Sequence, residues 1–173
     1  MATVLHRTSL MLLTSVNTPD YSPVEWIHNP DLSAVEGVPD YYWKIQGNDV
    51  LAMDAGERAA VDALRMPMLI AAKKAEWEVA CREFIHSHYA PHQQQTLSVL
   101  LSEARAAGLT NRVNYILQAL GWVDAVLTYY YGIEAAIEAA TTPAGLDAVT
   151  WDFTPYDAAD PDVSIRQARQ ILN

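Results

Sequence analysis

The sequence predicts a mainly α-helical protein, in which a small extended head containing a β-hairpin precedes an antiparallel helical bundle. Three observations support this class. Prolines recur in the first third of the chain, a turn-forming tetrapeptide separates two short apolar segments, and apolar residues recur every three or four positions after residue 54. We therefore expect an extended, hairpin-containing head over residues 1–53 and a helical domain over residues 54–173.

The composition is that of a folded protein without a general surface for nucleic acid. Hydrophobic residues make up 51% of the 173 residues and charged residues 18%, which lies away from the range of disordered chains. Eleven Lys and Arg against 21 Asp and Glu give a net charge of -10, so a phosphate-binding face is not expected. The lone Cys81 has no partner for an intrachain disulfide.

The apolar stretch "SLMLLTSV" near the N-terminus predicts a strand. It is too short for a membrane span, and it lacks the apolar core and cleavage site of a secretory signal. No membrane partner is therefore expected.

The rest of the head should be extended and end in a hairpin. Pro23, Pro30 and Pro39 remove backbone donors and favour extended conformations in the residues before them. The segments "YYWKI" and "VLAM" flank "QGND", whose residues tolerate the positive φ of tight turns. Alternation along the first strand places Tyr41 and Trp43 on one face, together with Ile45.

Three aromatic residues of the head, Trp26, Tyr41 and Trp43, form a hypothetical docking surface for a partner. The head has few helices of its own to cover so much aromatic area, and aromatic side chains are enriched at interfaces. The alternative is an internal contact between these side chains and the helical domain.

The first long helix should begin at an aspartate. Asp54 can accept from the free amides of the first turn, and Glu57 three residues later completes a capping box. Pro67 interrupts the helical pattern, so either a kink or two helices are expected. Apolar side chains then form one stripe at spacings of three and four: Val61, Leu64, Met68, Ala71, Ala72, Ala75 and Val79.

This stripe needs a partner, which could be another copy of the chain or another helix of the same chain. Its small side chains bury little area each, so the stripe is most effective where helices approach closely around a symmetry axis. We expect a homo-oligomer with a seam formed by Val61, Leu64, Met68, Ala72, Ala75 and Val79. Packing against the third helix of the same chain is the alternative.

Further helices follow with clear boundaries. Pro91 and Gly108 mark the start and the end of a second helix, with Leu97, Leu100, Leu101 and Ala104 as its apolar stripe. Thr110 should cap a third helix with the strongest 3.6-residue pattern, which runs from Val113 to Ile137. Short links favour antiparallel neighbours. A short helix at Thr142, the loop "TWDFTPYDAADPDV" and a terminal helix "SIRQARQIL" complete the chain.

No catalytic, cofactor-binding or metal-binding set emerges from the sequence. His86, His88 and His92 lie close in sequence, but their expected positions on the helix diverge and no further ligands complete a site. Glu83 and His86 make only half of a di-metal motif. Cys81 lies in a helical context typical of a small buried side chain. We expect no enzyme; a metal-dependent enzyme, the remaining alternative, would hold bound metal after purification.

Two longer stretches carry a family resemblance: "YYWKIQGNDVLAMDAGERAAVDA", and "YAPHQQQTLSVLLSEARAAGLTNRVNYILQALGWVDAVLTYYY" followed by "TWDFTPYDAADPDVSI". Together they resemble small proteins of tailed bacteriophages and prophages, over about residues 38–173. The resemblance implies a structural protein of the phage virion, in the tail or tail-fibre apparatus, which is assembled in the host cytoplasm. It also implies other virion proteins as partners and a trimer as the first expected oligomer.

The same resemblance leaves a second role open, that of a tail-fibre assembly chaperone which is absent from the mature virion. Its motifs are structural and do not assign a position in the particle. Pro67 departs from the uninterrupted alanine-rich helix expected of such proteins.

Overall fold

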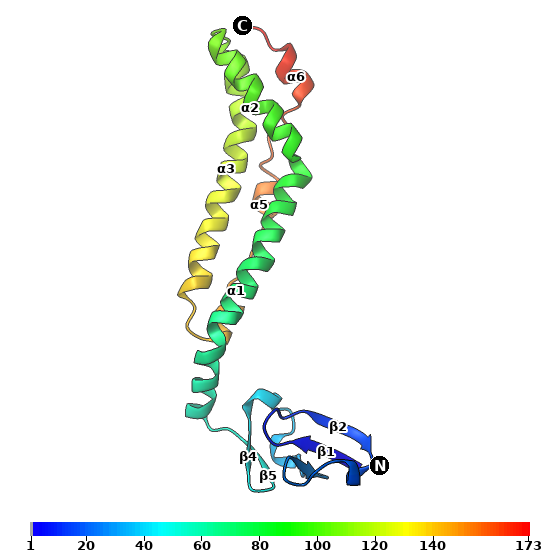
Figure 1. Cartoon of the computed structure of the whole chain (residues 1–173). Coiled ribbons are helices and arrows are strands. Elements are labelled where there is room, and N and C mark those ends of the chain that lie inside the picture. Colours follow the sequence, from blue (N-terminus) through cyan, green and yellow to red (C-terminus); the bar gives the residue numbers. More distant parts are fainter. Residues whose placement is uncertain (1) are drawn as a thin grey trace. The chain divides into compact units, whose positions relative to one another are not determined.

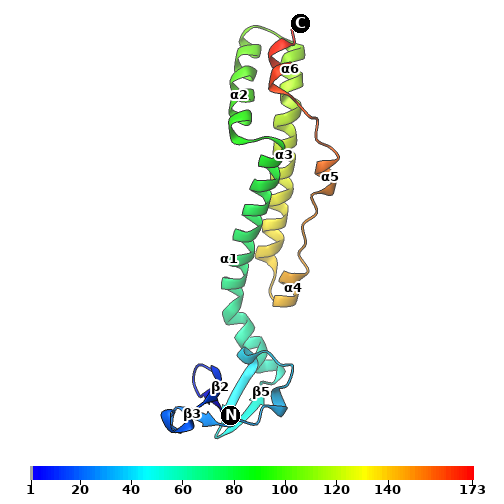
Figure 2. The same ribbon diagram turned by 90° about the vertical axis from the view of Figure 1, so that its right-hand side faces the viewer.

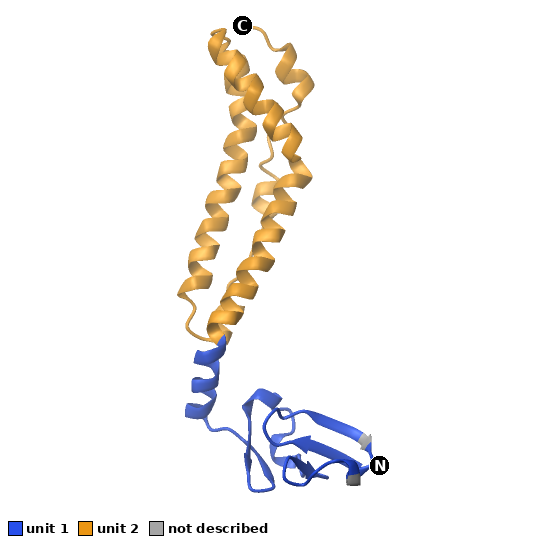
Figure 3. Ribbon diagram, viewed as in Figure 1, with its two compact units in different colours: residues 1–65 blue, residues 66–173 orange. Residues whose placement is uncertain are grey.

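The computed structural model describes residues 2–173 and is mainly α-helical, with small antiparallel sheets near the N-terminus (Figure 1). The chain divides into two compact units, residues 1–65 and residues 66–173 (Figure 3). The sequence predicts the boundary between the head and the helical domain at residues 53/54. The boundary between the two compact units instead lies between residues 65 and 66, inside the first long helix.

The first unit contains two antiparallel sheets. Strands β1 (Ala2–His6), β2 (Leu12–Val16) and β3 (Trp26–His28) form one sheet in the order β2-β1-β3, and β4 (Trp43–Gln46) pairs with β5 (Asp49–Ala52). Three single 3-10 turns connect them: η1 (Thr18–Asp20), η2 (Ser33–Val35) and η3 (Asp40–Tyr42). Leu5, Ile27, Val35 and Val50 form the buried core of this unit.

The predicted hairpin is confirmed, with one correction. Gly47 adopts a φ of +65° in the two-residue turn, and Trp43 pairs with Ala52 across the strands. Tyr41 does not share a strand face with Trp43, because it lies in η3, where the amide of Tyr42 donates to the carbonyl of Pro39. The predicted N-terminal strand begins only at Leu12, and the sequence did not predict β1 or β3.

The first long helix, α1 (Ala55–His88), continues through Pro67, so of the two expected alternatives, a kink or two helices, the second does not occur. Proline has no N–H to donate to the carbonyl of Ala63, four residues earlier. Both Ala63 and Pro67 are exposed, so water can solvate that carbonyl and the helix can continue.

The second unit contains the rest of α1, then α2 (Pro91–Ala106) and α3 (Thr110–Ala139), followed by the short helices α4 (Pro143–Asp147), α5 (Thr154–Asp157) and α6 (Ile165–Gln170). In this unit, α2 continues beyond the end of α1, and α3 runs back alongside both helices (Figures 1 and 2). The C-terminal segment with α4, α5 and α6 then returns along the helices (Figure 2).

The predicted helix boundaries in this unit are confirmed with two differences. Pro91 begins α2, Gly108 follows it with a φ of +68°, and the Thr142 hydroxyl accepts from the amide of Gly145 at the start of α4. Thr110 is the first helical residue rather than the cap, which is Leu109. One helical turn, α5, lies within the predicted loop.

The core of the second unit combines residues of α1, α2 and α3 with residues of the C-terminal segment. All four stripe residues predicted for α2 are buried, as are Ile116, Val126, Tyr130 and Ile137 of α3. From the C-terminal segment, Leu146, Val163 and Ala168 are also buried. The C-terminal segment from Pro143 onward therefore contributes to the core.

Candidate docking and assembly surfaces

The junction between the hairpin and α1 is a structural joint closed by a capping box. The carboxylate of Asp54 accepts from the amide of Glu57 at 2.9 Å, and the carboxylate of Glu57 accepts from the amide of Asp54 at 2.8 Å. Lys44 of β4 donates to the same Glu57 carboxylate at 2.7 Å. The predicted capping box is confirmed, and the lysine connects it to the sheet.

Two further contacts explain why the first turns of α1 belong to the first unit. The Tyr42 hydroxyl donates to the carboxylate of Asp62 at 2.6 Å. The guanidinium of Arg65 lies over the ring of Tyr41, 3.6 Å from its centroid, in a cation–π contact. The polar and aromatic residues at the junction thus fix the first turns of the helix, up to Arg65, to the hairpin.

Charge at this joint should make the first unit sensitive to acid. The Lys44 ammonium and the amide of Asp54 lower the pKa of Glu57, and the amides of Glu57 and Gly56 lower the pKa of Asp54 against a smaller effect of burial. Stability from these groups is complete above the ordinary carboxyl range and is lost as pH falls through the lowered values. We expect Glu57→Gln to weaken the acid dependence of the thermal midpoint of the first unit.

The matched control is Glu25→Gln, which changes an exposed carboxylate of the same unit. Thermal melts of both variants and the wild type between pH 3 and 7, followed through the hairpin signals, give the comparison. An acid dependence in Glu57→Gln identical to that of the wild type would show that the joint contributes nothing.

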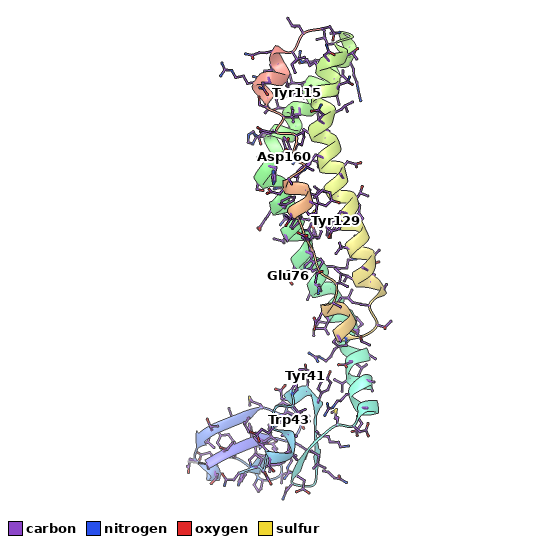
Figure 4. The ribbon with its side chains drawn as sticks, turned by 180° about the vertical axis from the view of Figure 1, so that it is seen from behind. Tyr41, Trp43, Glu76, Tyr115, Tyr129 and Asp160 are labelled. Carbon is purple, nitrogen blue, oxygen red and sulfur yellow. The ribbon has the colours of Figure 1, made fainter. Side chains whose placement is uncertain are left out.

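The three aromatic residues of the hypothetical docking surface have different environments. Trp26 is half-buried and packs edge-on against His6 and Tyr21, with ring centroids 4.7 Å and 5.0 Å apart. Trp43 is half-buried, and its indole N–H donates to the carbonyl of Val38 at 2.8 Å. Tyr41 is 39% exposed (Figure 4).

The first unit therefore covers part of this aromatic area itself, contrary to the expectation that the head has too little structure to do so. Docking through these residues stays a prediction. Of the three, Tyr41 is the most exposed and offers a partner the most side-chain surface.

The predicted seam lies on the outward side of α1. Leu64 is 83% exposed, Met68 65% and Val79 40%, while Ala72 and Ala75 are also exposed and Val61 is half-buried. The alternative, in which this stripe packs against the third helix of the same chain, is wrong. A different set of residues turns to the core: Met66, Leu69, Ile70, Trp77, Cys81, Phe84 and Ile85.

The helix α1 is thus apolar on two opposite sides over residues 66–80. The side facing the core is fixed to α3 by Lys74, which forms ion pairs with Glu134 at 2.9 Å and with Glu138. Apolar side chains on the solvent side of a helix are stabilised when a partner removes them from water. The outward stripe is therefore a candidate assembly surface.

A second polar cluster, which the sequence did not predict, lies at the end of α1. The Nδ1 of His88 lies 2.8 Å from a carboxylate oxygen of Asp160, and its Nε2 lies 3.2 Å from a carboxylate oxygen of Asp157. The Tyr89 hydroxyl donates to Asp160 at 2.8 Å. These contacts join α1 to the C-terminal segment, 72 residues away in the chain.

The histidines considered as metal ligands do not converge. Across residues 2–173, no group of three or more His, Cys, Asp or Glu side chains is arranged to hold a metal ion. His86 and His92 are exposed, whereas His88 turns to the two aspartates.

A groove of about 470 Å³ opens between α1, α2 and α3 on the second unit. Its floor includes Cys81 and Tyr130, and its rim includes Glu78 and Arg82. Burial raises the pKa of the Cys81 thiol to about 11, so little thiolate is present at neutral pH. Cys81 is 3% exposed and behaves as the buried apolar side chain that the sequence predicted.

Comparisons of the chain with protein-family models, with characterised proteins and with solved structures found no match. Within residues 2–173, no helix combines the length and the apolar character needed to cross a membrane. We therefore infer the function from the surfaces of the molecule and from the resemblance in its sequence.

Proposed function

We propose that this chain is a non-enzymatic structural protein of a bacteriophage virion, in the tail or tail-fibre apparatus, and that it acts by docking and self-association. The observation that carries self-association is the apolar outward stripe of α1, in which Met68 is 65% exposed and Val79 40%. The sequence resemblance to small proteins of tailed phages and prophages supports the location in the virion after assembly in the host cytoplasm.

Self-association would use the stripe as a seam between copies. Ala71, Ala72 and Ala75 are exposed and small, so a second helix can approach them closely, and Met68 supplies a larger side chain to fill the space between two helices. The antiparallel helical bundle expected from the sequence would then be completed by helices of neighbouring copies. A homo-oligomer follows, with a trimer as its first expected number because the resemblance points to phage fibres.

Docking would use the first unit. Tyr41 presents an exposed ring whose orientation Arg65 fixes, and a rigid aromatic side chain is a suitable anchor for another virion protein. With a net charge of -10, a nucleic acid is a poor candidate for the partner. We propose no membrane partner and no cofactor.

Mass spectrometry of purified virions of the encoding phage tests this function. We expect peptides of the chain in stoichiometric amounts with the tail proteins, and fewer in particles assembled with Met68→Glu, because a carboxylate in an apolar seam prevents close helix packing. Val99→Glu is the control, since Val99 is an exposed apolar residue on α2.

Absence of the chain from mature particles, together with its presence in infected cells, would contradict the structural role. That result would support the alternative, a tail-fibre assembly chaperone.

A further inference from the structure

The groove between α1, α2 and α3 is open to a partner, because no other part of residues 2–173 lines it. Its volume is about 470 Å³. The C-terminal segment packs on a different part of α3, where the rings of Trp151 and Tyr156 each lie 5.2 Å from that of Tyr129. In the groove itself, Tyr131 of α3 remains 59% exposed.

The outward stripe of α1 leads directly into this groove. Ala71 and Ala75 are exposed residues of the stripe, and two residues that line the groove, Glu78 and Arg82, continue the same spacing of three and four residues. Residues at this spacing lie on one side of a helix. The stripe and the groove therefore form one continuous surface of the second unit.

Met68 and the groove lie at equal distances from Ala75 along the helix. Met68 precedes Ala75 by seven residues and Arg82 follows it by seven, so each lies about 10.5 Å away along the helix axis. Met68 is 65% exposed, and its unbranched side chain can fill an irregular apolar hollow. A two-fold axis at Ala75 would therefore bring the Met68 of each copy to the groove of the other.

We propose that the groove binds Met68 of a second copy of this chain, in a pair whose α1 helices run antiparallel about a two-fold axis near Ala75. Apolar residues of the groove contact the methionine: Ile85, Val123 and Leu127. The inference rests on the proposed function, because it specifies how the stripe self-associates. The occupant is a second copy because the chain carries the projecting side chain and the groove on one surface at matched spacing, so each contact forms twice.

Small side chains at the centre of the pair allow the two helices to approach closely. Ala71, Ala72 and Ala75 are exposed, and none of them extends beyond a Cβ. The distance between the axes of packed helices depends on the side chains between them and is about 8–10 Å. Alanine at the axis favours the short end of this range, which brings Met68 within reach of the groove.

The charges on α1 favour the antiparallel arrangement over a parallel one. Two basic residues precede Ala75, and three acidic residues with one arginine follow it: Lys73, Lys74, Glu76, Glu78, Arg82 and Glu83. Antiparallel pairing places the basic segment of one copy beside the acidic segment of the other, whereas parallel pairing places like charges side by side. Because Lys74 already pairs with Glu134, the main effect is the separation of the two acidic segments.

A trimer does not give this contact. A three-fold axis along α1 keeps the helices of all copies parallel, so each Met68 lies at the level of the other Met68 side chains and about 21 Å along the helix from Arg82. For this seam we therefore expect two copies rather than the three that the family resemblance implies.

Distances between spin labels in the full chain, measured by electron paramagnetic resonance, test the arrangement. Labels at Glu76→Cys lie close to the axis, so they are separated mainly by the helix spacing of about 8–10 Å and by their own arms. Labels at Ser87→Cys lie twelve residues from Ala75 in each copy, so they are about 36 Å apart along the helices. We expect a short distance from the first variant and a long one from the second. The wild type treated with the same label is the control, because its lone Cys81 is buried.

A substitution in the groove tests its part in the contact separately. Tyr131→Glu changes an exposed residue of α3 and leaves α1 intact. It should raise the dissociation constant of the pair at least about ten-fold, because a carboxylate is costly in an apolar contact. Ala125→Glu, at an exposed position of α3 outside the groove, should keep the wild-type constant. Analytical ultracentrifugation measures both constants.

Short distances from both labelled variants would overturn the antiparallel pair and still agree with self-association. An unchanged dissociation constant for Tyr131→Glu would overturn the binding of Met68 in the groove. Labelled chains without any coupling between labels, together with a wild-type mass of a single chain, would contradict the proposed self-association as well.

Discussion

Replacing Trp122 with alanine is expected to lower the free energy of unfolding of the second unit by about 3–5 kcal/mol. Trp122 is 6% exposed, and its ring lies 5.7 Å from that of Phe84 and 5.6 Å from that of Tyr89. The substitution leaves a large cavity between α1 and α3. It also removes the indole donor from the carbonyl of Tyr156.

Urea unfolding followed by circular dichroism measures this effect. The control is Val99→Ala on the surface of α2, where the side chain is 55% exposed and a change below about 0.5 kcal/mol is expected. Trp122→Phe, which retains part of the ring packing, should lie between them. A loss below about 1 kcal/mol for Trp122→Ala would contradict its central place in the core.

Replacing Leu5 with alanine should unfold the first unit and leave the helices of the second unit folded. Leu5 is fully buried on the central strand β1, where it pairs with Leu12 of β2 and Ile27 of β3. Loss of its buried side chain costs about 2–5 kcal/mol. A unit of this size has little stability in reserve, so a loss of this order can exceed it.

Amide exchange resolved by residue distinguishes the two units in this experiment. Protection should disappear from β1 and β4 and remain in α2 and α3, while the control Val24→Ala, at an 81% exposed position, should change neither. Simultaneous loss of protection in both units would show that they unfold as one cooperative body.

Local signals made the helices of the second unit and the hairpin predictable. Pro91 and Gly108 act through their own backbone limits, and Asp54 with Glu57 closes a box of four consecutive residues. Gly47 supplies the positive φ of the hairpin turn. Each of these features depends on neighbours in the chain, so the sequence alone is enough to recognise it.

Local signals did not predict the pairing of β1 with β3, nor which side of α1 faces the core. Strand β3 has three residues, and its partners in β1 lie 20 to 24 residues earlier, so it has almost no periodic signal of its own. In α1, Met66 and Trp77 on the core side and Met68 and Ala75 on the outward side both follow helical spacing. Periodicity identified the helix but not which of its two apolar sides is buried.

The contact of His88 with the C-terminal segment depends on long-range structure. Two neighbouring histidines make His88 a candidate metal ligand in the sequence, yet its partners Asp157 and Asp160 lie in a segment without periodic pattern. Only the return of the chain along α1 brings these groups together. The sequence contains an aspartate-rich stretch near aromatic residues, but this pattern does not indicate which of its residues contact α1.

Light scattering at micromolar concentration most directly tests the central claim that the outward stripe of α1 joins copies of this chain. We expect the wild type to have a mass that is a multiple of 19.2 kDa, and the variants Met68→Glu and Ala75→Glu to approach the monomer mass. Val99→Glu on α2 should keep the wild-type mass. A wild-type mass near 19.2 kDa that both stripe variants leave unchanged would contradict the account.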